Sequence, residues 1–439
     1  MRTRLLLIVA ALHLAAACAV AAPPEAAVEQ AHTEIWRRFV DRHGVFLDFT
    51  DLDGAVDLPT PEECRDGKPN ALGWWSPIEN GAMFNGLYMD GALQRWQHTR
   101  RPADADKARR LMEGLLFLNS VSDVEGFVAR GASTDGRSHY PMGSNDQTLP
   151  WLTGLWQYHQ SDLATPDEKT RISKHLVRTA EVIAARGWTM PAEPPFGTRG
   201  TFEGFHFEEV ARKLFTLKML HALTSDAKWD ALYRAELERR GAVEASPTPA
   251  NTAGDKPGRP AERSKRDICE TGMAFFYAKT HNWTSCAGVG ALRQLWELES
   301  DPGLKASYAK GLAASARLAA ESLPLAIEFN PDDRSVFVTD WRTSMLPLWQ
   351  PQKTEHEAVK LAEQQLRAFL KVSPRRQKET AFIREPTSAA WIVTLCPDKE
   401  VVRPHSDAIR QVVGRYDYSK LYYSTFFWVE GAWWRLQAL

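Results

Sequence analysis

The chain has 439 residues, of which 44% are hydrophobic and 25% are charged, and its formal net charge is −1. This composition supports a sizeable folded core and makes global disorder unexpected. The near-zero net charge argues against a nucleic-acid-binding protein, because such proteins normally carry a basic domain.

The first 21 residues have the pattern of a secretory signal peptide. Two arginines precede an apolar stretch from residue 5 to residue 20, and residues 19–21 form an A-x-A cleavage site. Lipid attachment at Cys18 is the weaker alternative. We therefore expect a secreted or periplasmic mature chain that comprises residues 22–439. No later stretch is long and apolar enough to span a membrane.

Helical periodicity recurs along most of the mature chain. Three possible capping boxes, at residues 76–79, 144–147 and 165–168, mark helix starts. Convincing strands are nearly absent, and residues 336–338 are the best short exception. Helices are predicted at about 25–42, 77–97, 103–118, 144–160, 166–187, 205–223, 227–240, 286–298, 304–322, 341–349, 355–372, 387–395 and 405–413.

Short turns rich in Asp, Pro and Thr join these helices in pairs and recur mostly at intervals of roughly 45–75 residues. This repetition predicts an all-α fold, an (α/α)6 toroid of six helical hairpins in a single catalytic domain. The tight turns should line one end of the ring, and the long loops should gather at the other end. Residues 241–265, rich in Pro, Ala, Thr, Ser and Gly, are predicted to form a flexible surface insertion. The turns lie at residues 98–104, 161–167, 224–226, 300–303, 350–354 and 396–399.

Four cysteines remain after removal of the leader, and four cysteines permit three pairings. Cys269 and Cys286 flank one loop, so this pair is the favoured disulfide. No spacing resembles a zinc site, and we expect neither a metal nor another cofactor.

The long loops, and the helix starts beside them, carry residue types that suit sugar binding. Trp and Tyr faces stack on sugar rings, Arg and His bind carboxylates, and helix N-termini favour anionic ligands. The expected substrate is therefore an oligosaccharide or polysaccharide. The candidates are Trp74, Trp75, Arg130, His139, Tyr140, Arg199, Glu203, His206, His281, Asn282, Trp283, Trp341, Arg342, Arg384 and Glu385.

Two segments, residues 74–81 (WWSPIENG) and 146–152 (DQTLPWL), resemble motifs of the six-hairpin glycosidase group. This group includes unsaturated glucuronyl and rhamnogalacturonyl hydrolases and related β-glucuronidases. The Arg-Gly-Asn-Gly-Trp motif common in unsaturated uronyl hydrolases is missing here. The resemblance implies a glycoside hydrolase that cleaves a uronic-acid-containing glycan, with Asp146 as the general acid/base. Asn80 and Gln147, which lie in the same two segments, complete the expected set of substrate contacts.

Glycoside hydrolysis needs two carboxyl groups, one to protonate the leaving oxygen and one to act as base or nucleophile. Asp146 is the expected general acid and Glu79 the expected second carboxylate, with Asp90 and Glu203 in reserve. A purely structural role remains open for each of them: Glu79 can simply close a capping box, and Asp146 can simply cap a helix.

Two other functions are kept open. A polysaccharide lyase would use Tyr140 or His139 as the base at C5 of a uronate, with Arg130 and the residues 281–283 neutralising its carboxylate. A non-catalytic glycan-binding protein would need none of the carboxylates. The aromatic residues between 422 and 434 are expected to close the core, although Tyr422 and Tyr423 can reach the site.

Overall fold

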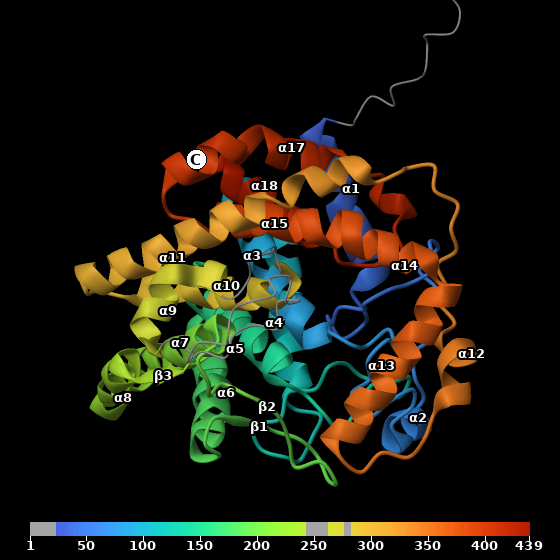
Figure 1. Cartoon of the computed structure of the whole chain (residues 1–439), viewed down its shortest axis with the longest axis horizontal. Helices are drawn as coiled ribbons and strands as arrows, with labels where there is room; N and C mark the ends of the chain where they lie inside the picture. Colours follow the sequence, from blue (N-terminus) through green and yellow to red (C-terminus); the bar gives the residue numbers. More distant parts are fainter. Residues whose placement is uncertain (1–22, 243–261, 276–281) are drawn as a thin grey trace, which may run out of the picture.

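The computed structural model describes residues 23–242, 262–275 and 282–439. Three predictions therefore fall outside the described residues. They concern the signal peptide, most of the insertion at 241–265, and His281. The described chain is predominantly helical, which confirms the all-α prediction (Figure 1). Its longer helices are α1 (Pro24–Glu34), α3 (Gly81–Thr99), α4 (Pro102–Leu118), α5 (Asn145–Gln160), α6 (Pro166–Ala185), α7 (Phe207–Thr224), α8 (Ala227–Glu238), α9 (Lys265–Thr271), α10 (Asn282–Leu298), α11 (Pro302–Ala320), α13 (Glu355–Val372), α15 (Glu385–Thr394), α17 (Ser406–Gly414) and α18 (Trp428–Gln437).

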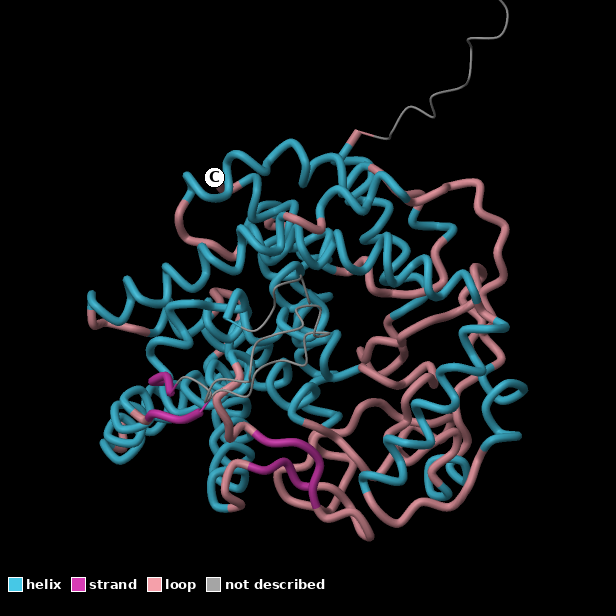
Figure 2. The backbone as a smooth tube through the Cα atoms, viewed as in Figure 1, coloured by secondary structure: helices cyan, strands magenta, loops and turns pink. Residues whose placement is uncertain are grey.

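Shorter elements occupy the connections. β1 (Thr189–Pro191) pairs antiparallel with β2 (Thr198–Thr201), and β3 (Arg240–Ala242) pairs antiparallel with β4 (Glu262–Ser264). Residues 336–338 form no strand, so that prediction is wrong. Loops gather on the side of the molecule that carries α2 (Pro61–Asp66), α12 (Trp341–Met345) and α13 (Figure 2). The short helices are α2 (Pro61–Asp66), α12 (Trp341–Met345), α14 (Pro374–Glu379) and α16 (Lys399–Val402).

The capping predictions have mixed outcomes. The Thr165 hydroxyl accepts a hydrogen bond from the Glu168 backbone N–H, and the Glu168 carboxylate accepts one from the Thr165 N–H, which confirms a capping box. The predicted box at residues 76–79 is wrong, because α3 begins only at Gly81. There the Ser76 hydroxyl donates instead to the Gly73 carbonyl, 2.7 Å away. α5 begins near the predicted residue 144, without a side-chain cap.

Six helices contact one another in succession. α3 packs on α5, α5 on α7, α7 on α10, α10 on α15 and α15 on α18, and α18 in turn packs on α3 (Figure 1). Other helices pack against this set, including α4 on α3, α6 on α5, α8 on α7 and α11 on α10. The two helices of each of these pairs are consecutive in the chain, and a predicted short turn connects them.

The predicted helix 341–349 is not a member of this succession. Only residues 341–345 form α12, which packs on α13, and the position beside α15 and α3 belongs to α18. Trp341 is fully buried in a separate cluster with Phe49 and Phe369, and its indole N–H donates to the Asp57 carbonyl. Packing against this N-terminal loop therefore holds the segment away from the central helices.

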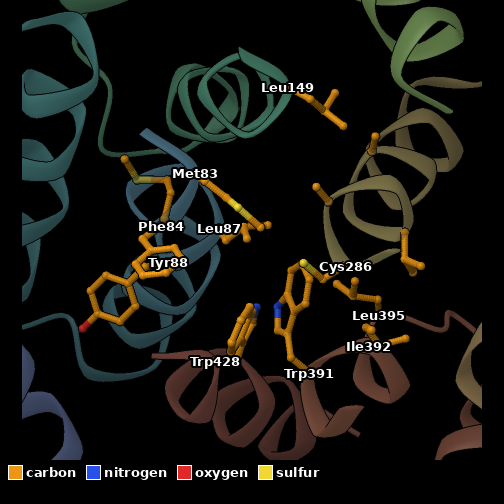
Figure 3. Packing of buried hydrophobic residues seen from close by; sticks show 14 of the residues in the cluster. Met83, Phe84, Leu87, Tyr88, Leu149, Cys286, Trp391, Ile392, Leu395 and Trp428 are labelled. Carbon is orange, nitrogen blue, oxygen red and sulfur yellow. The ribbon is translucent and has the colours of Figure 1, made fainter. Parts of the chain in front are cut away.

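Apolar side chains fill the space between the six helices (Figure 3). The C-terminal aromatic residues belong to this core, as predicted: Phe426, Phe427, Trp428 and Trp433 are at most 3% exposed. The contributors labelled in Figure 3 are Met83, Phe84, Leu87 and Tyr88 of α3, Leu149 of α5, Cys286 of α10, Trp391 and Ile392 of α15, Leu395, and Trp428 of α18.

The approach between α3 and α5 depends on two glycines. A Cβ atom on Gly86 would lie 2.0 Å from the Pro150 carbonyl oxygen, and one on Gly154 would lie 2.7 Å from the Cα of Gly86. No other residue type fits without moving one helix, because the closest neighbours are backbone atoms.

The favoured disulfide is not formed. Cys64, Cys269, Cys286 and Cys396 are all free and buried. Cys269 lies on α9, which packs on α11, whereas the Cys286 thiol on α10 donates to the Trp283 carbonyl. The two residues flank one loop in sequence, but they occupy different helices and form no disulfide.

Candidate functional site

The N-terminal ends of α3, α5, α7 and α10 border one cavity of about 400 Å³, here called the loop-side cavity. Segments around α13 and α14 form its other wall. Helix N-termini present free N–H groups, and their dipoles favour a negatively charged ligand. The cavity is lined by Trp74, Trp75, Glu79, Asn80, Met83, Arg130, Asp146, Glu208, Trp283, Thr284, Ala287, Leu366, Leu370, Arg376, Gln377, Thr380, Arg384 and Tyr423.

Two carboxylates in this cavity share one partner. Asp146 is the second residue of α5 and Glu208 is the second residue of α7. Nη2 of Arg212 lies 2.8 Å from Oδ1 of Asp146 and 3.7 Å from Oε2 of Glu208. Arg212 is only 3% exposed. The two carboxylate oxygens are therefore no farther apart than the combined length of these two contacts.

The carboxyl group of Glu208 has an unusual proton affinity. Burial raises its pKa to about 7; the Arg212 guanidinium opposes this shift, and the negative charge of Asp146 adds to it. The Ser285 hydroxyl lies 3.4 Å from Oε1 of Glu208. At neutral pH this carboxyl group therefore exists in both protonation states, as a general acid requires.

Glu79 belongs to a second acidic pair in the same wall. Its Oε2 accepts a hydrogen bond of 2.8 Å from the Trp75 N–H. Asp48 is fully buried and accepts hydrogen bonds from the backbone and the side chain of Asn80. Burial, and then the charge of Glu79, raises the pKa of Asp48 well above its ordinary value.

Among the described arginines that line the cavity, Arg376 has the fewest hydrogen bonds. Its guanidinium carbon lies within 6 Å of the rings of Trp75, Tyr423, Phe49 and Phe369. Its nearest carboxylate oxygen, on Glu79, is 3.6 Å away. Within the described part of the chain, Nη1 of Arg376 has no hydrogen-bond partner. A buried guanidinium in this state suits an incoming carboxylate, which can accept two parallel hydrogen bonds.

Arg384 and Trp283 form a further cation–aromatic pair in the wall. The guanidinium lies 4.5 Å from the centre of an indole ring and donates to Glu385. Trp74 and Trp75 lie close to each other at the same cavity, at an interplanar angle of 63°. The cavity thus offers several aromatic faces beside its charged groups.

Eight of the predicted site residues line the loop-side cavity together. Gln147 lies directly behind them, where its amide donates to Asn80 and accepts from the Met83 N–H. The eight are Trp74, Trp75, Glu79, Asn80, Arg130, Asp146, Trp283 and Arg384. Arg130 lines the cavity, but its guanidinium donates to the carbonyl oxygens of Glu79, Met142 and Gly143, so it braces the surrounding loops.

His139 and Tyr140 do not line this cavity. The Tyr140 hydroxyl donates to the Lys68 carbonyl, 2.6 Å away, and the residue is 1% exposed. His139 pairs with Glu193 at 3.0 Å and borders a different cavity. The structure therefore does not place these two side chains beside the carboxylates.

The other predicted site residues have partners elsewhere. Arg199 pairs with Glu355 at 2.8 Å, and Glu203 pairs with Arg239 at 2.6 Å. Asp90 pairs with Arg435, far along α3 from the loop-side cavity. His206 caps α7, and Trp341 is buried beside α13, as described above.

Sequence reasoning missed Glu208 and Arg376. A signal for Glu208 was present, because it stands in the first turn of a predicted inner helix, as Asp146 does. No such signal exists for Arg376, which follows Arg375 in an unremarkable polar run. Arg375 pairs with Glu379, whereas Arg376 turns towards the cavity, and only the tertiary structure separates their roles.

In the part of the chain that the structure describes, no group of three or more His, Cys, Asp or Glu side chains could hold a metal ion. No helix there has both the length and the apolar character needed to cross a membrane.

No protein-family model matches the chain, and no match is found among curated proteins or among solved structures. The chemistry of the loop-side cavity is therefore the basis for inferring the function.

Proposed function

We propose that the chain is a secreted or periplasmic glycoside hydrolase that cleaves a uronic-acid-containing glycan. The observation that carries this proposal is the pair Asp146 and Glu208, two carboxylates that meet at Arg212 in a cavity with several Trp faces. Glycoside hydrolysis needs such a pair, held so that one member is protonated and the other is ionised.

The proposed architecture is an (α/α)6 toroid. Its inner helices are α3, α5, α7, α10, α15 and α18. The closed succession of their contacts supports this arrangement. The sixth pair would consist of α18 and α1, which come from opposite ends of the described chain and pack on each other. The helix predicted at 341–349 then lies outside the ring, where α12 packs on α13 behind the wall of the site.

In the proposed reaction, Glu208 donates its proton to the glycosidic oxygen as the leaving group departs. Asp146, oriented by Arg212, either removes a proton from the attacking water or attacks the anomeric carbon itself. The pKa of Glu208, raised to about 7, supports its role as the acid. In this assignment Asp146 is the base or nucleophile, whereas the sequence predicted it to be the general acid. Glu79, which the sequence predicted to be the second carboxylate, is assigned to substrate binding instead.

The uronate carboxylate would bind at Arg376, whose guanidinium has unused donors, with Arg384 as a second cation nearby. Trp74, Trp75 and Trp283 would stack on the apolar faces of sugar rings. The helix N-termini around the cavity add favourable electrostatics for an anionic substrate.

The test is to incubate the purified protein with a panel of uronic-acid glycans and their unsaturated oligosaccharides. Reducing ends and the ultraviolet absorbance of the C4=C5 double bond are followed together. Hydrolysis releases reducing ends, and absorbance stays constant or falls if an unsaturated end is removed. Glu208→Gln and Asp146→Asn should each lower kcat by at least about 100-fold. Asp407→Asn, at the same helical position in α17, is the matched control and should keep full activity.

Two outcomes would contradict the proposal. A rise in absorbance would indicate β-elimination by a lyase, and the base would then have to be sought first at Tyr423, which lines the cavity among the described residues. Saturable glycan binding without any release of reducing ends, unchanged in both variants, would indicate a binding protein.

A further inference from the structure

A second cavity, of about 420 Å³, lies at the opposite ends of the helices that form the site. We call it the turn-side cavity. Its walls are the C-terminal parts of α3, α5 and α10, together with Arg435 of α18. Along α3, Met83 borders the loop-side cavity and Gln94 borders the turn-side cavity. At 1.5 Å per residue these positions are roughly 16 Å apart, and the core shown in Figure 3 lies between them.

The distinctive feature of this cavity is its set of five glutamines, Gln94, Gln97, Gln157, Gln160 and Gln294. Gln294 is only 4% exposed and lies in the wall of the cavity. Oε1 of Gln157 is buried and has no hydrogen-bond partner among the described residues. A buried polar group without a partner costs free energy, so the Gln157 amide favours an occupant that donates a hydrogen bond to it.

The charges around the turn-side cavity are already paired with one another. Asp90 accepts hydrogen bonds from Arg435 and from the Trp391 indole. Arg293 pairs with Glu297 at 2.7 Å. The groups left for a ligand are therefore neutral amides, each of which can donate and accept.

The C-terminal ends of α3, α5 and α10 also make the cavity unfavourable for an anion. The last carbonyl groups of a helix have no partner within it, and its C-terminus carries a partial negative charge. Hydroxyl groups can donate to such carbonyls, whereas carboxylates cannot. Trp156, 4% exposed, adds an apolar surface to the same wall.

We propose that the turn-side cavity is a binding site for a neutral, polyhydroxylated ligand of the size of a mono- or disaccharide. The paired donors and acceptors of the glutamine amides match the hydroxyl groups of a neutral sugar. The volume of the cavity falls within the range of small-ligand sites. This site is independent of the carboxylate pair, and its occupancy requires no catalysis.

The test is a titration of the full mature chain with neutral mono- and disaccharides, followed by calorimetry and by ligand-observed NMR. Glucuronate serves as the charged comparator. At least one neutral sugar should bind saturably, and Gln294→Leu combined with Gln157→Leu should weaken this binding by at least about tenfold. Gln377→Leu is the matched control, because Gln377 lines the loop-side cavity instead, and it should leave neutral-sugar binding unchanged.

Three results would overturn the proposal. The first is no saturable binding of any neutral sugar. The second is binding that survives the double substitution, and the third is binding lost in Gln377→Leu but kept in the double variant. If the double variant fails to fold, Gln97→Leu combined with Gln160→Leu tests the rim of the same cavity with less risk to the core.

Discussion

Asp146 and Glu208, which stand at the second positions of α5 and α7, present their carboxylate oxygens to the same nitrogen of Arg212, 2.8 and 3.7 Å away. This contact makes the charge state of one carboxyl group depend on the other. Arg212 limits the mutual repulsion, and burial keeps the proton affinity of Glu208 high.

The first prediction concerns the pH dependence of activity. Because Glu208 must be protonated to act as the acid, kcat should fall as the pH rises through about 7. Arg212 lowers the pKa of Glu208, so Arg212→Gln should move this alkaline limb to higher pH. The measurement is a pH–rate profile of both proteins. An alkaline limb at the same pH in both would contradict the coupling.

The second prediction concerns the pH dependence of stability. Since the pKa of Glu208 is raised to about 7 in the folded state, the folded protein binds more protons than the unfolded chain between about pH 4.5 and 7. This stabilising contribution is complete below pH 4.5 and is lost as the pH rises through 7. Glu208→Gln should therefore gain stability relative to the parent, by up to about 3 kcal/mol between pH 4 and pH 8. Denaturant unfolding at both pH values, with Asp407→Asn as the control, measures the difference.

The third prediction separates two arginines of the same cavity. Arg376→Met should raise KM or Kd for a uronate ligand by about 10- to 100-fold, because a charge-assisted hydrogen bond is lost. Arg130→Met should instead lower the free energy of unfolding by about 3 kcal/mol or more, because several carbonyl oxygens lose their donor. Ligand titration and thermal unfolding of both variants would distinguish these roles. Equal losses of affinity in two stable variants would count against the distinction.

The fourth prediction concerns the contact between α3 and α5. Gly86→Ala should destabilise the protein by about 2 kcal/mol or more, because the added methyl group would collide with the Pro150 carbonyl. Gly290→Ala, in α10, is the milder control, since the nearest neighbour of the added methyl group is an indole atom 3.2 Å away. Similar unfolding midpoints for the two variants would show that the helices can separate without cost.

The fifth prediction concerns the cysteines. Thiol titration of the unfolded mature chain, without reductant, should find four free thiols. Burial raises the pKa of the Cys269 and Cys286 thiols, which lowers their reactivity in the folded state. A reductant should therefore leave the melting temperature unchanged. A lower melting temperature in reductant would reveal a disulfide.

The helical pattern and most hairpin partners were predictable because periodicity and short turns are local signals. The capping box at Thr165 is an example, since its two hydrogen bonds involve residues three positions apart. Residues 76–79 carry the same local pattern, but Trp75 adopts a positive φ and Glu79 accepts from the Trp75 N–H, so the helix starts later. Contacts outside the four-residue pattern therefore determine whether a capping box forms.

The site was predictable only in part, for a similar reason. Asp146, Glu79 and the Trp residues stand at loops and helix starts that meet in one cavity. The helical position of Glu208 signals a role, but its burial against α10 sets its proton affinity, and burial is a property of the whole fold. Arg376 differs from Arg375 only in the direction of its side chain, which the sequence does not encode locally.

The two cavities share α3, α5 and α10, and this limits how the chain can evolve. Inserting one residue into the middle of such a helix would rotate everything after it by about 100°. Residues placed at one end would then point into a neighbouring helix while those at the other end stayed in place. Changes of length should therefore accumulate in the connecting loops, whereas the segments between Asn80 and Gln94 and between Asp146 and Gln157 should change only by substitution.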